Sequence, residues 1–144
     1  MSALSKLNLD DDFQEALGVE DAQRWSLTRK NDLVVWVEVH PVDHPGERFT
    51  ARLLWSEYPG DLPPSVMFVD PVTGSSAVRS AWPTGAGFRP PSDICATWTR
   101  EGYQLHPEWL GDKSKRLVIR GNALLLVLRV LQHELDCNFT GRFG

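Results

Sequence analysis

Hydrophobic residues near the start of the chain recur with the period of an α-helix. Four apolar side chains follow one another at helical spacing: Leu9, Phe13, Ala16 and Leu17. Such spacing places them in one stripe on a helix. Either Asn8 or Asp10 is suited to cap its start, and Gly18 is suited to end it. The pattern therefore predicts an amphipathic helix at the N-terminal end of the chain.

From Trp25 onwards the apolar residues alternate with polar ones or form short continuous runs, as they do in β-strands. Four short strands are expected, over residues 25–28, 33–39, 49–55 and 66–69. The second is the clearest, because it is rich in β-branched and aromatic residues. Polar or proline-containing turns separate these strands. We therefore expect an antiparallel meander with a helix on one face.

A long irregular stretch follows the strands. Residues 75–92 contain prolines at 83, 90 and 91 and glycines at 85 and 87, so that no long element fits there. A loop of this length in a compact domain is usually either functional or disordered. Regular patterning resumes at Asn122, which is suited to cap a helix over residues 123–135. One face of that helix is apolar: Leu124, Val127, Leu128, Leu131 and Leu135.

Together these elements predict an α+β fold in a single domain, residues 1–144. It consists of an N-terminal helix, a four-stranded antiparallel meander, an irregular active-site flap and a C-terminal core helix. We expect the last helix to pack on the sheet, and residues 136–144 to form a short polar tail. The hydrophobic content of 42% is sufficient for a packed core.

The charge balance and the apolar runs exclude several classes of partner. Fifteen Lys and Arg against 19 Asp and Glu give a net charge of −4, whereas nucleic-acid-binding domains are usually basic. The longest apolar runs, residues 33–37 and 123–128, are far shorter than the roughly 20 residues that span a bilayer. The first residues also lack the apolar block of a signal peptide. We expect a cytoplasmic protein that binds no nucleic acid and no membrane.

Cysteine and histidine spacing argues against a metal or cofactor. The two cysteines and four histidines form neither a CxxC nor an HExxH motif. No glycine-rich loop of the phosphate-binding kind precedes a helix. The two cysteines make no disulfide framework, and a reducing compartment leaves both as thiols.

Cys95 is the candidate nucleophile. It follows the Pro/Gly-rich flap and has polar neighbours in Ser92 and Thr97, which favours an accessible thiol. A thiol attacks acyl groups more readily than a hydroxyl does, because part of it is already thiolate near neutral pH. The alternative is that Cys95, next to Ile94, is a small buried hydrophobic residue. Cys137 lies just beyond the predicted helix, and we expect Cys95 to be the more reactive of the two.

His106 is the candidate for proton transfer. It lies eleven residues after Cys95 and could act as a general base or orient an acceptor amine. The alternative is a turn residue, because Pro107 follows it directly. The other three histidines, His40, His44 and His133, are expected to be solvated.

Two local motifs accompany this order of elements. The turn Tyr58-Pro59-Gly60-Asp61-Leu62-Pro63-Pro64 leads into the fourth strand, and Asp93-Ile94-Cys95 closes the flap. With these motifs, the chain resembles the ubiquitin-conjugating enzymes, the E2 family with the UBC-like fold. The elements come in the same order: a helix, a meander, a proline-rich turn, a flap with a cysteine and a core helix. The resemblance extends over roughly residues 9–135, by element order more than by identity. In that family, the cysteine forms a thioester with the modifier.

The chain departs from the eukaryotic family at two places. That family has a His-Pro-Asn tripeptide before its cysteine, and the corresponding stretch here is Trp82-Pro83-Thr84-Gly85. The two C-terminal helices of the family have no counterpart in a truncated chain that ends soon after the core helix. Both features are similar to divergent bacterial E2-like proteins, which occur in operons with E1-like and ubiquitin-like partners. This similarity implies a modification pathway or antiviral defence.

The resemblance implies a transferase that carries a ubiquitin-like protein as a thioester on Cys95. The partners would be an E1-like adenylating enzyme, the ubiquitin-like protein and a protein acceptor, with the first helix and residues 41–46 as docking surfaces. Without the Asn, the oxyanion would be stabilised by flap N–H groups or by Ser92 or Thr97. The alternatives are a catalytically inactive E2-like binding or adaptor module, and an α+β domain whose thiol is incidental.

Overall fold

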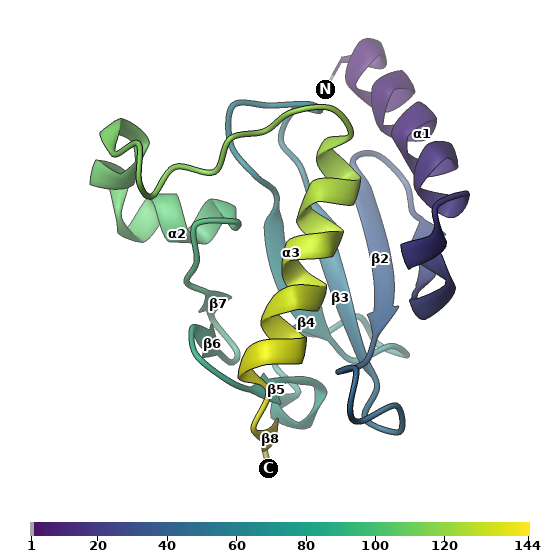
Figure 1. Cartoon of the computed structure of the whole chain (residues 1–144), viewed down its shortest axis with the longest axis vertical. Helices are drawn as coiled ribbons and strands as arrows, with labels where there is room; N and C mark the ends of the chain where they lie inside the picture. The colour runs from purple at the N-terminus through teal and green to yellow at the C-terminus, as the bar shows by residue number, and fades with distance from the viewer. Residues whose placement is uncertain (1) are drawn as a thin grey trace.

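A four-stranded antiparallel sheet with the strand order β1-β2-β3-β4 forms the centre of the molecule (Figure 1). The structure is a computed structural model that describes residues 2–144. The four strands lie within one residue of the positions that the hydrophobic pattern predicts: β1 (Ser26–Arg29), β2 (Val34–Val39), β3 (Phe49–Leu54) and β4 (Ser65–Val69). Each pairs antiparallel with the next, so that the expected meander is confirmed.

Two helices pack against this sheet. Val35, Val37 and Val39 of β2 are fully buried, whereas the residues between them are half-buried, as expected for a strand with one covered face. Helix α3 (Ala123–Asn138) lies in front of the sheet in Figure 1, and α1 (Ala3–Leu17) runs beside α3 near the β1 edge. The main hydrophobic cluster draws on both helices and on the strands.

The C-terminal core helix follows the prediction at its start. The side chain of Asn122 accepts a hydrogen bond from the N–H of Leu125 at 2.9 Å, which makes it the expected N-cap. The predicted apolar face is buried throughout: Leu124, Val127, Leu128, Leu131 and Leu135. The helix therefore supplies a large part of the core.

Helix α1 begins earlier than its apolar pattern indicates. Ser2 is the N-cap and accepts a hydrogen bond from the N–H of Ser5 at 3.1 Å, so that Asn8 and Asp10 lie inside the helix and cap nothing. The additional first turns escape the hydrophobic pattern because Ser5, a polar residue, occupies their buried position. Leu17, expected on the buried face, is exposed. Only Leu9, Phe13 and Ala16 of the predicted stripe are buried.

The region around the flap contains short elements, and two of them correct the expectation of a wholly irregular stretch. A six-residue helix α2 (Arg100–Leu105) and a 3-10 helix η3 (Pro107–Gly111) follow Cys95. The other short elements are η1 (Glu20–Arg24), η2 (Arg79–Ala81), β5 (Pro83–Thr84), β6 (Phe88–Arg89), β7 (Asp93–Ile94) and β8 (Gly141–Arg142). They are too short to show a hydrophobic period.

The chain after residue 135 is not the polar tail that its composition predicts. Helix α3 continues to Asn138, and β8 pairs antiparallel with β5. Phe139 and Phe143 are partly buried against the core, which explains why this segment is held in place. Asp136 also accepts a hydrogen bond from the N–H of Val42 at 2.8 Å. Among the residues described, no helix combines the length and the apolar character needed to cross a membrane.

Tyr58 fixes the proline-rich turn between β3 and β4 to both long helices. Its hydroxyl donates to Asp12 of α1 and accepts from the N–H of Leu124 of α3 at 2.9 Å. Its own N–H donates to Ser5 at 3.1 Å. Burial and the hydrogen bond to Asp12 raise the pKa of Tyr58 above its usual value, so that the hydroxyl stays protonated.

Candidate active site

A two-stranded hairpin leads directly into Cys95. Strand β6 (Phe88–Arg89) pairs antiparallel with β7 (Asp93–Ile94). The N–H of Cys95 donates to the carbonyl of Gly87 at 2.9 Å, which continues the pairing by one residue. Because directly opposed residues of paired strands point to the same side, the hairpin has two faces of different chemistry.

The inner face of the hairpin is apolar and holds it to the sheet. Phe88 and Ile94 are directly opposed and are both buried. The ring of Phe88 meets that of Phe68 in β4 edge-on, with 5.4 Å between the ring centroids. The hairpin is thus anchored to the core through its inner face, which leaves the outer face for Cys95.

The outer face presents Cys95 beside an ion pair. Arg89 and Asp93 are opposed, and Nε and Nη2 of Arg89 donate to the two carboxylate oxygens of Asp93, each at 2.7 Å. Gly87 is opposed to Cys95 and carries no side chain. It also has a φ of +83°, and a Cβ there would lie 2.8 Å from the carbonyl oxygen of Cys95. Glycine is therefore needed at this position, because it allows the backbone to approach that of Cys95, whose thiol is half-buried.

The guanidinium of Arg89 is electrostatically coupled to Cys95. The hydrogen bond to Asp93 is the main cause that raises the pKa of Arg89, followed by the charge of Asp93. The charge of Cys95 raises the pKa of Arg89 as well, but it is a smaller cause than the two that involve Asp93. Nη1 of Arg89 makes no hydrogen bond within residues 2–144 and can donate to another anion.

Helix α2 holds the loop that follows Cys95. The buried hydroxyl of Thr99 donates to the carbonyl of Ile94 at 2.6 Å and accepts from the N–H of Gly102 at 3.1 Å, as the N-cap of α2. A Cβ on Gly102 would lie only 1.9 Å from the carbonyl oxygen of Ala96. The close approach of α2 to this loop therefore requires a glycine.

The two predicted hydroxyl residues lie on either side of Cys95 along the chain. Ser92 is exposed in the β6–β7 turn, where its N–H donates to the carbonyl of Arg89 at 2.9 Å. Thr97 is half-buried, and its carbonyl accepts from the hydroxyl of Tyr103 at 2.7 Å. These backbone hydrogen bonds fix the turn that contains Ser92 and the loop that contains Thr97. Their roles in stabilising an oxyanion stay predictions.

His106 lies beyond α2, and its partners come from the next helix. Its Nδ1 is 3.2 Å from a carboxylate oxygen of Glu108. Its ring stacks on Trp109, with 4.3 Å between the centroids and 15° between the planes. These contacts hold the imidazole against η3 rather than the hairpin. The role of His106 as a general base stays a prediction.

Cys137 is the more exposed of the two thiols. Its Sγ lies 3.6 Å from Nε2 and 3.8 Å from Nδ1 of His133, one helical turn earlier on α3. General alkylating reagents therefore reach Cys137 easily, and exposure alone does not rank the two thiols. A test of Cys95 needs a reagent that is selective for the proposed chemistry.

Sequence reasoning missed Arg89, Gly87, Gly102 and Thr99 as parts of the site. One available signal was the pair of opposite charges at Arg89 and Asp93, on either side of the turn Pro90-Pro91-Ser92. The two glycines could not be recognised from the sequence. They are needed because the fold brings their backbone close to the carbonyl groups of Cys95 and Ala96.

Comparisons of the chain with protein-family models, with curated proteins and with solved structures find no match. The function is therefore argued from the residues and geometry of the chain itself.

Proposed function

We propose that this protein is an E2-like conjugating enzyme with a UBC-like fold, which carries a ubiquitin-like protein as a thioester on Cys95. The observation that carries this proposal is the outer face of the β6–β7 hairpin. There Cys95 lies opposite a glycine and on the same face of the hairpin as the Arg89–Asp93 ion pair. The order of helix, meander, flap and core helix supports the same function.

The proposed reaction consists of two acyl transfers. The Cys95 thiolate attacks the carbonyl carbon of the thioester between the modifier and the cysteine of an E1-like enzyme. A new S–C bond forms, and the E1 cysteine leaves as a thiolate. An acceptor amine then attacks the Cys95 thioester and displaces the Cys95 thiolate, and the proton that its nitrogen loses is taken up by solvent. Both steps pass through a tetrahedral intermediate that carries a negative oxygen.

Arg89 is suited to stabilise that negative oxygen. The space opposite Cys95 is free of a side chain because residue 87 is glycine. Among residues 2–144, the two N–H groups on Nη1 of Arg89 have no hydrogen-bond partner, whereas Nε and Nη2 hold Asp93, which fixes the plane of the guanidinium. Preorganised donors of this kind stabilise developing charge without reorganisation. Arg89 is therefore a candidate to stabilise the oxyanion, in addition to Ser92 and Thr97, in a chain that lacks the His-Pro-Asn motif.

The experiment tests the covalent intermediate. The chain is mixed with a cognate ubiquitin-like protein, its E1-like enzyme and ATP, and adducts are separated with and without reductant. We expect a reductant-sensitive adduct with the native chain, and an adduct that resists reductant but not alkali with Cys95→Ser. Cys95→Ala should form neither, whereas the control Cys137→Ser should behave like the native chain.

Arg89 is tested in the same assay through the rate of adduct formation. Arg89→Ala should slow loading by about 10²-fold, the lower range for loss of an oxyanion donor. It also leaves the buried carboxylate of Asp93 without this partner, so loading is measured well below the unfolding midpoint of the variant. Arg48→Ala, which breaks an ion pair whose two side chains are both exposed, is the control. If no adduct forms with the cognate E1 present, the chain is an E2-like binding module without this chemistry.

A further inference from the structure

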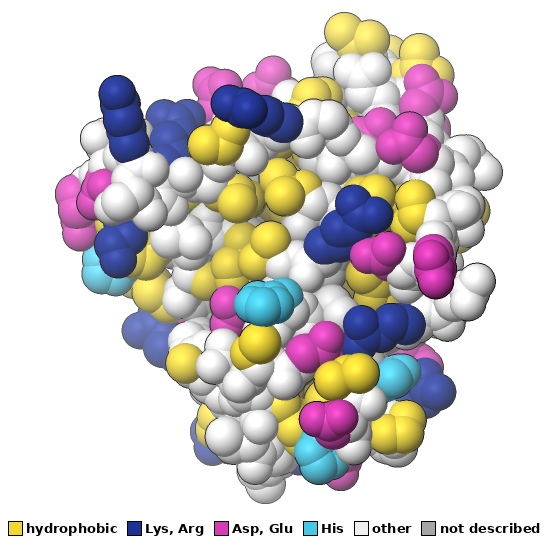
Figure 2. Space-filling model, viewed as in Figure 1, with side chains coloured by type: hydrophobic (Ala, Val, Ile, Leu, Met, Phe, Trp, Pro, Cys, Tyr) yellow, Lys and Arg dark blue, Asp and Glu magenta, His cyan; other side chains and the backbone are white. Residues whose placement is uncertain are grey.

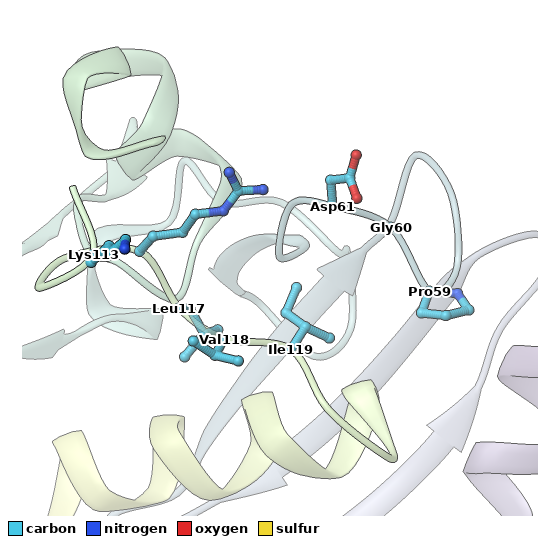
Figure 3. Close-up of a pocket in the computed structure, with 8 residues that line it drawn as sticks. Pro59, Gly60, Asp61, Lys113, Leu117, Val118 and Ile119 are labelled. Carbon is cyan, nitrogen blue, oxygen red and sulfur yellow. The ribbon is translucent and has the colours of Figure 1, made fainter. Parts of the chain in front are cut away.

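A groove separates the proline-rich β3–β4 turn from the segment that precedes α3. It encloses about 610 Å³. Figure 3 shows Pro59, Gly60 and Asp61 on one side, Leu117 and Val118 on the other, and Ile119 between them. The floor is apolar, and the groove does not include Cys95.

The segment of residues 117–120 that borders this groove has the burial pattern of an edge strand. Leu117 and Ile119 are half-buried against the core, whereas Val118 and Arg120 are exposed. Alternation with a period of two is typical of an extended chain with one covered face. No turn, bend or helix interrupts these four residues.

The backbone of this segment lacks partners. Within residues 2–144, the N–H and C=O groups of Val118, Ile119 and Arg120 make no hydrogen bond to the protein. The N–H of Leu117 donates to the hydroxyl of Tyr103 at 2.8 Å, which fixes the start of the segment. Unpaired backbone groups on an extended chain are a template for the addition of a strand from a partner.

The same segment carries concentrated positive charge. Four cations lie within eight residues, with no acidic residue among them: Lys113, Lys115, Arg116 and Arg120. None of the four forms an ion pair of 4.0 Å or less within the described residues 2–144. In Figure 2, dark blue side chains gather at the upper left, the region of α2 and of the segment before α3 in Figure 1. This patch is basic in a chain whose net charge is −4.

A smaller pocket extends the groove beyond Gly60 and Asp61. It encloses about 170 Å³ and is lined by Arg100. Nε of Arg100 is buried and has no hydrogen-bond partner among residues 2–144. A further cation with unused hydrogen-bonding capacity therefore lies where the groove continues.

We propose that this groove binds an extended acidic segment of a partner protein by strand addition to residues 117–120. In the added strand, alternate side chains point to opposite faces. Aliphatic residues of the partner that pair directly opposite Ile119 insert into the apolar groove. Acidic residues that pair opposite Arg120 contact the basic side chains. Asp61 on the opposite wall repels an acidic chain, which confines the carboxylates to the cationic side.

A synthetic peptide tests the charge requirement. A fluorescein-labelled peptide of alternating Glu and Val is titrated with the full chain, and polarisation is measured. We expect binding that weakens with salt and falls by about tenfold or more in Arg116→Glu/Arg120→Glu. Lys30→Glu, on the β1–β2 turn at the far edge of the sheet, should bind like the native chain. Equal binding of the peptide with Lys in place of Glu would overturn the proposal.

Backbone pairing is tested separately from charge. An N-methylated version of the peptide keeps its carboxylates but loses backbone donors, and it should bind about tenfold more weakly or worse. Hydrogen exchange should slow at Val118, Ile119 and Arg120 when the unmodified peptide is bound. Unchanged exchange together with unchanged affinity of the methylated peptide would exclude strand addition.

Two further variants complete the test. Asp61→Asn removes the opposing carboxylate and should strengthen binding of the acidic peptide. Weaker binding would contradict the proposed placement of the peptide. Cys95→Ala should bind like the native chain, because the thiol is not part of the groove. The experiments can therefore contradict the peptide-binding proposal and the thioester proposal independently of each other.

Discussion

At the scale of single residues, two glycines determine how the chain approaches itself around Cys95. Gly87 allows the hairpin to close opposite the thiol, and Gly102 allows α2 to pack against the carbonyl of Ala96. Neither position tolerates a Cβ without movement of backbone atoms. The geometry around Cys95 thus depends on two residues that have no reactive side chain.

Gly102→Ala tests this dependence. Ala favours a helix over Gly by about 1 kcal/mol, yet here its Cβ would lie 1.9 Å from a backbone oxygen. We expect the overlap to outweigh the propensity and to lower the free energy of unfolding by about 1–3 kcal/mol. Gly111→Ala is the matched control, because a Cβ there meets nothing within 4 Å. Denaturant unfolding measures both, and equal stabilities would contradict the close contact.

At the scale of elements, Tyr58 joins the proline-rich turn to α1 and α3. Its hydroxyl satisfies an N–H in the first turn of α3, where helices have free donors. The turn also forms one wall of the groove, through Pro59, Gly60 and Asp61. The same tyrosine therefore supports both the core and the proposed docking surface.

Tyr58→Phe should cost about 1–3 kcal/mol of unfolding free energy, because it leaves the N–H of Leu124 and the carboxylate of Asp12 without this partner. The raised pKa of Tyr58 makes this cost pH-dependent. It is full below the unfolded pKa of about 10. The cost becomes smaller at higher pH. There Tyr58 of the native chain loses its proton on unfolding, which lowers the free energy of unfolding of the native chain but not that of Tyr58→Phe. Unfolding measured at several pH values checks this, and a cost that grows above pH ~10 would contradict it.

The hydrophobic pattern predicted the elements whose buried residues recur at regular spacing. It did not predict the elements that are too short or too irregular to show such spacing. Strand β2 was visible because Val35, Val37 and Val39 alternate with less buried residues. The first turns of α1 were not visible, because exposed Leu4 and Leu7 obscure the face that contains Ser5. The β6–β7 hairpin has two residues a strand, too few to show alternation. Cys95 was therefore proposed as the nucleophile from its residue type, and the arrangement around it came only from the fold.

At the scale of the whole molecule, charge is unevenly distributed. The chain is acidic overall, but the segment before α3 is basic over residues 113–120. The net charge concealed this local patch, because the acidic residues elsewhere outweigh it. The hydroxyl of Tyr103 connects the patch to the Cys95 loop, since it accepts from Leu117 and donates to Thr97. The two proposed sites thus share one framework.

The hydrophobic core predicts how the whole chain unfolds. One cluster contains buried residues of α1, the sheet, the flap and α3, so that these parts should unfold together. Leu128 of α3 is fully buried in this cluster, and Leu128→Ala should lower the free energy of unfolding by roughly 2–5 kcal/mol. Tryptophan fluorescence reports the sheet and flap through residues such as Trp36 in β2 and Trp82 in the flap, whereas far-ultraviolet circular dichroism reports the helices.

Both signals should shift by the same amount in Leu128→Ala, because the lost methyl groups stabilise one cooperative unit and not α3 alone. Val72→Ala is the control, since Val72 is 91% exposed and its truncation removes no core contact. Its two transitions should coincide with those of the native chain. Separate fluorescence and dichroism midpoints, or two stable fragments after limited proteolysis, would show that the sheet and α3 do not form a single domain.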